Sequence, residues 1–358
     1  MITRGIYLHS SFFVIIGFRK NNVLLCKKGI DCSMATIKDI AKQAGVSAAT
    51  VSRVINNSGY VSTETRNTVE KAISELKYVP NRHAQNLRRG STRNLGIITS
   101  TLGDTVLARI EPFMQFANDA NYTTTLFNTY KDPQRELETL DRLKSKELDG
   151  IFLIYRTNEW SAIEPYTQFG PIVTLHNIEN DDLNIPSVFI DHYEGYKLIL
   201  EDLWANGARS FINILGSSTG VNTKRRIKAY FDFCEEHHIE PHDIKPFLDI
   251  TGNNGGLRAV EMIEEMDLRP DAIIAHSDQV ASVIVSQYNK KGIKMPEDVS
   301  VVGFDNLIFS ELMDFTSVDY SIDEQGKNAC RLLLNELESD SYDLVPLEFN
   351  LIKRGTTK

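Results

Sequence analysis

The chain carries its most suggestive chemistry in a short segment near its N-terminal end. Ala48, Ala49, Thr50, Ser52 and Arg53 are small or polar, and such groups on one helix face fit the major groove of DNA. A guanidinium can donate two hydrogen bonds to guanine and so discriminate by about 1–3 kcal/mol, while an alanine can contact the methyl group of thymine. If a helix presents these residues to solvent, their chemistry is the recognition of base pairs.

The elements that must position these residues are predicted to be three helices. Apolar residues recur at helical spacing within 35–44, 48–56 and 63–78, which is the pattern of helices with one buried face. Gly45 turns the chain after the first helix without Cβ strain, and Ser47 and Ser62 cap the second and third. This arrangement is a helix-turn-helix, and the DNA contacts predicted for it also include Thr36, Ser47 and Asn56.

The charge of the 358-residue chain supports the same interpretation. Its net charge is −9. Residues 34–94 nevertheless hold ten Lys and Arg against four Asp and Glu, whereas residues 95–358 hold 24 against 43. A small basic segment on a large acidic body suggests contact with nucleic acid through that segment alone. No run of 18 apolar residues is present, which argues against a transmembrane helix.

Cysteine spacing and enzyme motifs exclude several function classes. Cys26, Cys32, Cys234 and Cys330 show no C-x-x-C pair and no paired His spacing, so neither a zinc site nor a disulfide framework is expected. The chain also lacks a P-loop, GxGxxG, HExxH and GxSxG. We therefore predict a cytoplasmic protein that is not an enzyme, with no catalytic residues, cofactor or metal.

Beyond residue 95 the pattern changes to short apolar runs that alternate with amphipathic helices. The runs are LGIITS, TTTLFN, GIFLIY, PIVTLH, SVFID, FINILG, AIIAHS and VSVVGFD. Apolar strands separated by helices indicate mostly parallel sheets covered on both faces. Because about ten strands are too many for one compact doubly wound unit, we predict two similar α/β lobes with a cleft between them.

Two segments carry a family resemblance. VSAATVSRVIN in the head and PEDVSVVGFDN in the body resemble the lactose/galactose-repressor (LacI/GalR) family of bacterial transcriptional regulators, and the similarity covers residues 34–358. The resemblance implies an all-α helix-turn-helix head on a two-lobed, parallel-sheet, periplasmic-binding-protein-like α/β core. It also implies a homodimer, a pseudo-palindromic operator in double-stranded DNA, and a small effector, expected to be a sugar or sugar derivative, in the cleft.

The same resemblance assigns PNRHAQNL to a hinge helix that folds on the operator. Ala84 and Leu87 would approach the minor groove, with Leu87 as a wedge at the central base step. Asn81 and Arg82 would contact the DNA backbone or bases nearby. Three further arginines are open to either a DNA-contacting or a solvated-linker interpretation: Arg88, Arg89 and Arg93.

Seven positions match effector contacts of that family. Arg226 falls where an arginine typically binds ligand hydroxyls or a carboxylate, and Asp305 where an aspartate accepts from sugar hydroxyls. A surface arginine and a turn residue are the alternatives for these two, and His176 is equally consistent with a turn residue. The remaining expected contacts lie at strand ends, at the following loop or at the lobe crossover: Ser100, Asp104, Asp191 and Ser277.

The expected domain boundaries follow from these patterns. They comprise an N-terminal extension without predicted function, the helix-turn-helix domain, a hinge with its linker, and the core: 1–33, 34–79, 80–94 and 95–358. In the core, lobe 1 is expected to include 95–191 and 322–345, and lobe 2 to include 192–321 and 346–358.

Two other function classes remain open at this point. A solute-binding protein with an inert N-terminal appendage would need an export signal, and a sugar-processing enzyme would turn over its ligand. The sequence favours a repressor whose operator affinity an effector controls. Whether the effector induces or co-represses depends on an energy difference between lobe arrangements on the order of a few kcal/mol, which no motif encodes.

Overall fold

A computed structural model describes residues 35–78, 91–178, 183–239, 246–338 and 341–358. The chain divides into two compact units, Met1–Gln85 and Asn86–Lys358, which are described separately. The expected N-terminal extension and the hinge residues Asn81, Arg82, Ala84 and Leu87 lie outside the described residues. In the described part of the chain, no helix is both long and apolar enough to cross a membrane.

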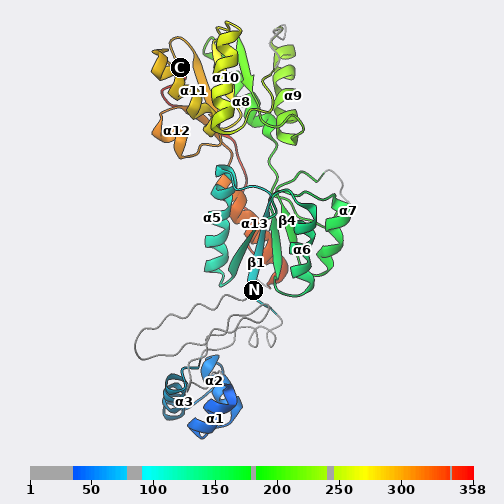
Figure 1. The fold of residues 1–358 in the computed structure, drawn as a ribbon, viewed down its shortest axis with the longest axis vertical. Coiled ribbons are helices and arrows are strands. Elements are labelled where there is room, and N and C mark those ends of the chain that lie inside the picture. Colours follow the sequence, from blue (N-terminus) through cyan, green and yellow to red (C-terminus); the bar gives the residue numbers. More distant parts are fainter. Residues whose placement is uncertain (1–34, 79–90, 179–182, 240–245, 339–340) are drawn as a thin grey trace, which may run out of the picture. The chain divides into compact units, whose positions relative to one another are not determined.

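The first unit consists of three short helices around a small apolar core: α1 (Ile37–Ala44), α2 (Ala48–Ile55) and α3 (Thr63–Glu75) (Figure 1). Ile40, Val51 and Val69, one from each helix, are fully buried against one another. Since each helix contributes an apolar stripe and is too short to be stable alone, the packing of these stripes holds the unit together.

Lobe 1 of the second unit is built on four parallel strands in the order β2-β1-β3-β4. The strands are β1 (Asn94–Thr99), β2 (Thr123–Asn128), β3 (Gly150–Leu153) and β4 (Ile172–Thr174). Two helices share an apolar cluster with one sheet face, α5 (Asp104–Asp119) and α13 (Ile322–Leu337). The opposite face packs against α6 (Pro133–Lys144), α7 (Trp160–Ile163) and the 3₁₀ turn η1 (Glu164–Gln168).

Lobe 2 has five strands in the order β5-β6-β7-β8-β9, of which only β9 is antiparallel to its neighbour. They are β5 (Phe211–Ile214), β6 (Ala272–Ala275), β7 (Ser300–Phe304), β8 (Thr316–Asp319) and β9 (Asn350–Ile352). One face packs against α8 (His192–Ala205) and α9 (Val221–Glu236), and the other against α10 (Gly252–Glu265) and α11 (Asp278–Lys291). The short α12 (Ile308–Leu312) follows β7.

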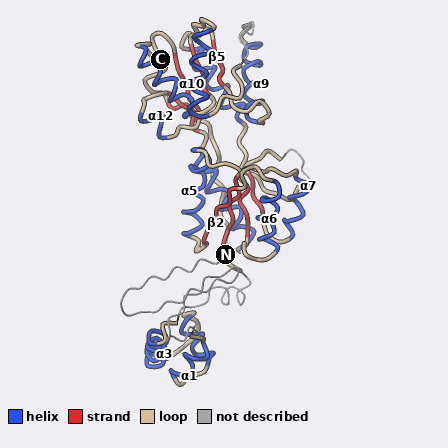
Figure 2. Tube along the Cα trace, viewed as in Figure 1, coloured by secondary structure: helices blue, strands red, loops and turns tan. Residues whose placement is uncertain are grey.

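The predicted architecture, a helical head and a core of two mostly parallel α/β lobes, is confirmed (Figures 1 and 2). One predicted strand is wrong: SVFID contributes a single bridge between Ser187 and Thr174 and then leads into α8. Pro186 precedes this segment and cannot donate to a strand neighbour, while Asp191 already caps the next helix. Two strands, β8 and β9, were not among the predicted runs.

Candidate functional site

The predicted DNA-contacting residues lie on and beside α2. Ala48, Ala49 and Arg53 are exposed, whereas Thr50 and Ser52 are half-buried. Val51 and Val54, on the other side of α2, are buried in the core of the unit. The helix therefore presents a small, polar face to solvent, which is what entry into a major groove requires.

Helix caps hold α1 and α2 in place. Thr36 and Asp39 form a reciprocal capping box at α1, with the Thr36 amide donating to the Asp39 carboxylate at 2.8 Å. Gly45 ends α1 at φ 65°, a conformation that costs other residues energy. Ser47 Oγ then accepts from the Thr50 amide at 3.1 Å. Thr36 and Ser47 thus have a structural role in addition to the predicted contact with DNA.

Arg53 and Asn56 differ in their contacts with other residues of the helical unit. The Arg53 side chain forms no ion pair with the described residues and its aliphatic part lies near Gly59. Asn56 is the C-cap of α2, and its side-chain amide donates to Ser52 Oγ at 3.2 Å. As far as the described residues go, the guanidinium of Arg53 is therefore available to a base or a phosphate.

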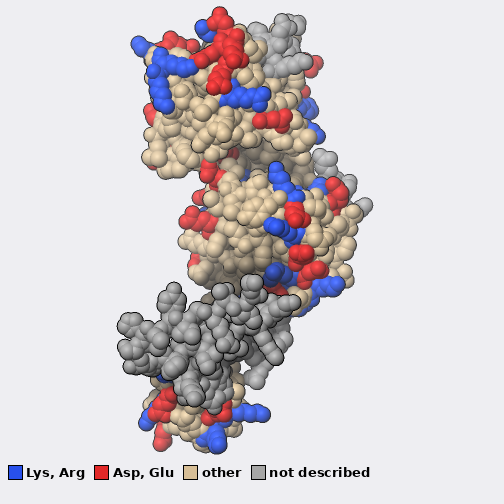
Figure 3. Space-filling view, in the orientation of Figure 1, with Lys and Arg blue, Asp and Glu red and all other residues tan. Residues whose placement is uncertain are grey.

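The described part of the first unit is only weakly basic. Residues 35–78 hold six Lys and Arg against four Asp and Glu, and both signs are present on the face drawn in Figure 3. The other basic residues of the head segment are four arginines: Arg82, Arg88, Arg89 and Arg93. Of these, Arg93 pairs with Glu338 at 2.5 Å and lies over the ring of Tyr122. These contacts give the residue a role in the fold, which is neither of the two interpretations predicted for it.

In the core, Arg226 and Asp305 lie in one buried polar cluster with residues of both lobes. Arg226 on α9 is 5% exposed and its guanidinium carbon lies 3.9 Å from the centroid of Phe304. It donates to the backbone oxygen of His276 and to Nδ1 of His192, both at 2.7 Å. Its Nε is buried and has no hydrogen-bond partner among the described residues, so the group retains a donor for another molecule.

Asp305 follows β7 directly and is 6% exposed. Its backbone has φ 123°, a strained conformation that is typical of functional positions. Tyr320 donates its hydroxyl to Asp305 Oδ1 at 3.0 Å. Burial and the nearby Asp278 raise the pKa of Asp305 to about 8, although Arg226 opposes the shift. At neutral pH the carboxyl is therefore mostly protonated and can donate as well as accept.

His176, another predicted effector contact, has different neighbours from those of Arg226 and Asp305. His176 lies after β4 among Arg156, Tyr155 and Trp160; its Nε2 accepts from the Arg156 amide at 3.2 Å. Burial, and then Arg156, lowers the pKa of His176 to about 4. The imidazole is thus neutral at pH 7.

Four of the predicted effector contacts occupy caps and loop ends. Asp191 caps α8 and forms an ion pair with Arg225, and Ser277 caps α11 by accepting from the Val280 amide at 3.4 Å. Ser100 follows β1, and Asp104 is the first residue of α5 and exposed. All four lie at ends of helices or strands. For Asp191 and Ser277 the hydrogen bonds give a sufficient structural reason for the residue type.

Three members of the buried cluster were missed at the level of sequence. Arg109 on α5 donates to Gln325 Oε1 at 2.9 Å and to the Tyr320 hydroxyl at 3.0 Å. His192 stacks on Phe304 with ring centroids 5.0 Å apart. Arg109 could have been recognised, because it lies between Val106 and Ile110 on the apolar face of its helix. Nothing in the pattern around Tyr320 or His192 distinguishes them.

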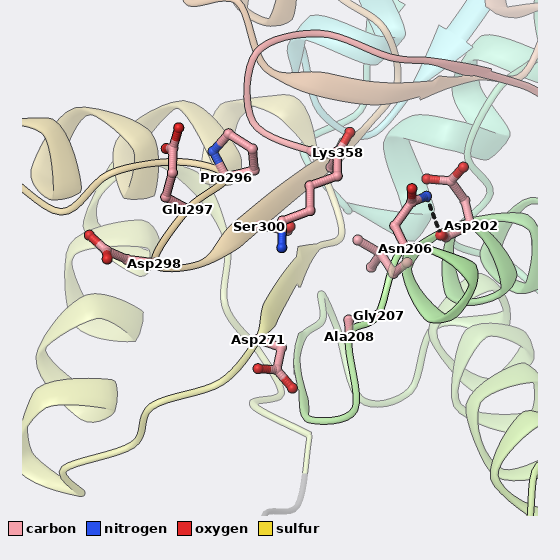
Figure 4. Close-up of a pocket in the computed structure, with 12 residues that line it drawn as sticks. Asp202, Asn206, Gly207, Ala208, Asp271, Pro296, Glu297, Asp298, Ser300 and Lys358 are labelled. Atoms are coloured by element: carbon pink, nitrogen blue, oxygen red, sulfur yellow. Dashed lines mark hydrogen bonds between the residues drawn. The ribbon is translucent and has the colours of Figure 1, made fainter.

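A small pocket elsewhere in lobe 2 has no comparable chemistry (Figure 4). It has a volume of about 70 Å³ and is lined by residues that include Asp202, Asn206, Asp271 and Ser300. Asp271 precedes β6 and Ser300 begins β7, so the pocket lies at the amino ends of the parallel strands. Ligands of such sheets collect at the carboxyl ends, where Asp305 lies.

One group of side chains has the composition of a metal site. Glu201, Glu236 and His237 bring their ligand atoms within 4.8 Å of one another on the surface of α8 and α9. Lys197 Nζ, however, lies 2.7 and 2.8 Å from the two oxygens of Glu236. An ion pair therefore already neutralises one of the three candidate ligands.

Comparison with known proteins agrees with the two-unit organisation. Residues 36–81 match the model of "bacterial regulatory proteins, lacI family", and residues 200–357 match that of a periplasmic binding protein-like domain. The NTD biosynthesis operon regulator NtdR of Bacillus subtilis is 32% identical over 330 residues, which cover 90% of this chain and all of the relative. The chain belongs to the lacI family.

A further relative of this lacI-family protein is also a transcriptional regulator. The ribose operon repressor of Halalkalibacterium halodurans is 30% identical over 333 residues, covering 91% of this chain and 98% of the relative. The fold is similar to that of the lac repressor dimer bound to operator and an anti-inducer, with a TM-score of 0.76 at 24% identity over 91% and 99% of the two chains. The expected family and fold are therefore confirmed.

Proposed function

We propose that this lacI-family protein is a homodimeric transcriptional repressor of the cytoplasm. It binds a pseudo-palindromic operator through α2, and a small ligand in its core controls that binding. The observation that carries the proposal is the combination of a capped, exposed α2 with a buried polar cluster drawn from both lobes. One chain thus holds a DNA-reading element and a ligand-responsive element.

In this proposal Ala48, Ala49, Thr50, Ser52 and Arg53 read bases in the major groove. Contacts near the helix ends come from Thr36, Ser47 and Asn56. The hinge residues Asn81, Arg82, Ala84 and Leu87 act at the minor groove, with Leu87 as the wedge. Because phosphate contacts release counterions, binding falls steeply as salt rises.

The effector binds at the carboxyl ends of the strands, where Arg226 and Asp305 lie, with His176, Asp191, Ser100, Asp104 and Ser277 as the other proposed contacts. Sucrose and glucose are bound in a lacI-family regulator from Lactobacillus casei whose fold this chain shares. A sugar or sugar derivative is the proposed ligand class. Its binding changes the relative arrangement of the lobes and thereby the population of the DNA-binding form.

Exposed apolar residues support the proposed dimer. Leu107 and Met114, seven residues apart on α5, are 47% and 41% exposed, and Ile308 and Leu312 on α12 are 57% and 75% exposed. Apolar side chains of this size on a helix face are typical of surfaces that a partner covers. A two-fold dimer buries the same face of both copies.

A selection of bound duplexes from a random DNA pool tests the proposal. We expect the purified full chain at moderate salt to enrich a palindrome with two equal half-sites. Leu87→Ala should then weaken binding to that palindrome far more than binding to unrelated DNA. If no sequence is enriched, either alone or with the sugars of the titration described below, the DNA-reading function is refuted.

A further inference from the structure

Two arginines from opposite lobes are buried in the core. Arg109 on α5 of lobe 1 is 6% exposed and Arg226 on α9 of lobe 2 is 5% exposed. Both lie at one aromatic pair: the guanidinium carbon of Arg109 is 5.5 Å from the ring centroid of Tyr320, and that of Arg226 is 3.9 Å from Phe304. The two rings have centroids 5.2 Å apart. The two cations therefore belong to one site.

Within the described residues, neutral groups accept the hydrogen bonds of both cations. Arg109 donates to the side-chain amide oxygen of Gln325, the backbone oxygen of Thr105 and the phenol oxygen of Tyr320. Arg226 donates to the backbone oxygen of His276 and to an imidazole, and its Nε has no partner in the described part of the core. The imidazole belongs to His192, whose pKa is well below its ordinary value because of burial and Arg226. Within the described residues, neither arginine forms an ion pair.

The acids of the site do not supply two compensating charges. Asp305 is mostly protonated at neutral pH, since its pKa is about 8. Asp278, fully buried, accepts from Ser317 Oγ at 2.5 Å and from the Leu307 amide at 2.6 Å. Its pKa of about 6 leaves it ionised at pH 7. The two buried arginines thus have near them one mostly neutral carboxyl, Asp305, and one ionised carboxylate, Asp278, on which Arg354 acts instead. Buried charge without compensation is costly.

We propose that the effector carries an anionic group, a carboxylate or a phosphate, and that Arg109 and Arg226 bind it beside Tyr320. This inference rests on the proposed effector function of the core. The orphaned Nε of Arg226 supplies a donor for the anion, and a guanidinium matches the geometry of either oxyanion. Arg109 then determines specificity, because it distinguishes an acidic sugar derivative from the neutral parent sugar.

The test is a thermal-unfolding titration of the full chain at low ionic strength without DNA. The probes are D-glucose, D-glucuronate and D-glucose 6-phosphate, the corresponding D-galactose series, D-ribose with D-ribose 5-phosphate, and inorganic phosphate alone. We expect at least one acid or phosphate ester to raise the midpoint more than its neutral parent does. A response only to uronates assigns a carboxylate, and a response only to esters assigns a phosphate.

Variants then identify the residue responsible. Arg109→Gln, which keeps a polar side chain at the site, should weaken binding of the anionic probe by about tenfold or more, as expected for the loss of a charge-assisted hydrogen bond, and leave the neutral parent unchanged. It should not lower the midpoint of the ligand-free protein. The matched control is Arg331→Gln on α13, which removes an arginine that pairs with Glu324. It should destabilise the protein and preserve the anion response.

Three results would overturn the proposal. They are equal or stronger stabilisation by neutral parents, no stabilisation by any anionic probe, and a full response from inorganic phosphate alone, which would indicate an adventitious anion only. An unchanged anion response in Arg109→Gln would overturn the role of that residue. Because DNA is absent, these results are independent of the operator selection, whose failure would refute the DNA-reading function instead.

Discussion

Replacing Asp305 by asparagine should stabilise the core at neutral pH. In the unfolded chain this carboxyl ionises near pH 3.8, whereas in the folded protein its pKa is about 8. At pH 7 folding must therefore protonate it, which at 1.36 kcal/mol per pH unit costs up to about 4 kcal/mol. Asparagine removes this cost, keeps an acceptor for Tyr320 and has the same shape as aspartate, so it adds no strain at the φ of 123°. A buried amide that lacks one partner costs about 1–3 kcal/mol, so we expect a net gain of about 1–3 kcal/mol.

The pH dependence is the sharper part of this prediction. The stability associated with a raised pKa is fully present below the unfolded value and is lost as pH rises through the folded value. The advantage of Asp305→Asn should therefore grow by about 1.4 kcal/mol per unit between pH 5 and pH 8 and level off above. Asp278, Arg226, Arg109 and Tyr320 act on the same carboxyl and remain in both proteins.

Urea unfolding followed by tryptophan fluorescence measures the effect in the full chain. The two tryptophans, Trp160 in lobe 1 and Trp204 in lobe 2, report on the core alone. Asp271→Asn is the opposite-sign control, since hydrogen bonds from Arg209 and Ser210 hold the pKa of Asp271 below its ordinary value. That variant should lose stability at pH 7 and recover as pH falls. An advantage of Asp305→Asn that is constant or shrinks with rising pH would refute the reasoning.

Three further variants test the DNA-reading unit and the core. Arg53→Ala should cost about 1–3 kcal/mol at one base pair of each half-site, measured by competition with single-base operator variants; a loss uniform across sequences, as expected for a phosphate contact, would contradict base recognition. Gly45→Ala should destabilise the helical unit by about 1–2 kcal/mol because of its φ of 65°, seen as faster hydrogen exchange in residues 35–78. Gly326→Ala places a Cβ against the backbone of α5 and should cost the core about 1–3 kcal/mol in the urea assay. Gly103→Ala meets open space at negative φ and should cost at most about 1 kcal/mol, because alanine is a poorer N-cap than glycine. A loss there as large as that of Gly326→Ala would contradict the packing argument.

Much of the fold could be predicted because periodicity and caps act locally. The helices of the first unit follow from the apolar spacing around Val51 and Val69 and from the caps Ser47 and Ser62. Strand β8 could not be predicted from the sequence, because its residues Thr316 and Ser317 are polar. Both are fully buried, where Thr356, Thr357 and Asp278 satisfy them. A polar strand that is paired only through distant residues leaves no local signal.

The effector region was less accessible to the same reasoning. Arg226 and Asp305 were identified from a family resemblance, and their roles remain predictions. Arg109 meets Tyr320 and Gln325, more than 200 residues away along the chain, so its electrostatic surroundings depend on the tertiary fold. The sequence does show a charged residue, Arg109, on the apolar face of α5. This pattern indicates an unusual position but does not predict which residues contact it.

The place of α13 in the sheet architecture has a consequence for synthesis of the protein. This helix supplies Ala329, Cys330 and Leu333 to the apolar cluster that covers Leu95 and other residues of the lobe 1 sheet. About 150 residues separate its start from the end of β4. Helix α5 covers only part of that sheet face, so at roughly 5–20 residues per second the part that α13 covers stays exposed for about 7–30 s on the ribosome. The nascent chain must therefore remain soluble with a half-built lobe, which makes it a natural client for chaperones that bind exposed apolar strands.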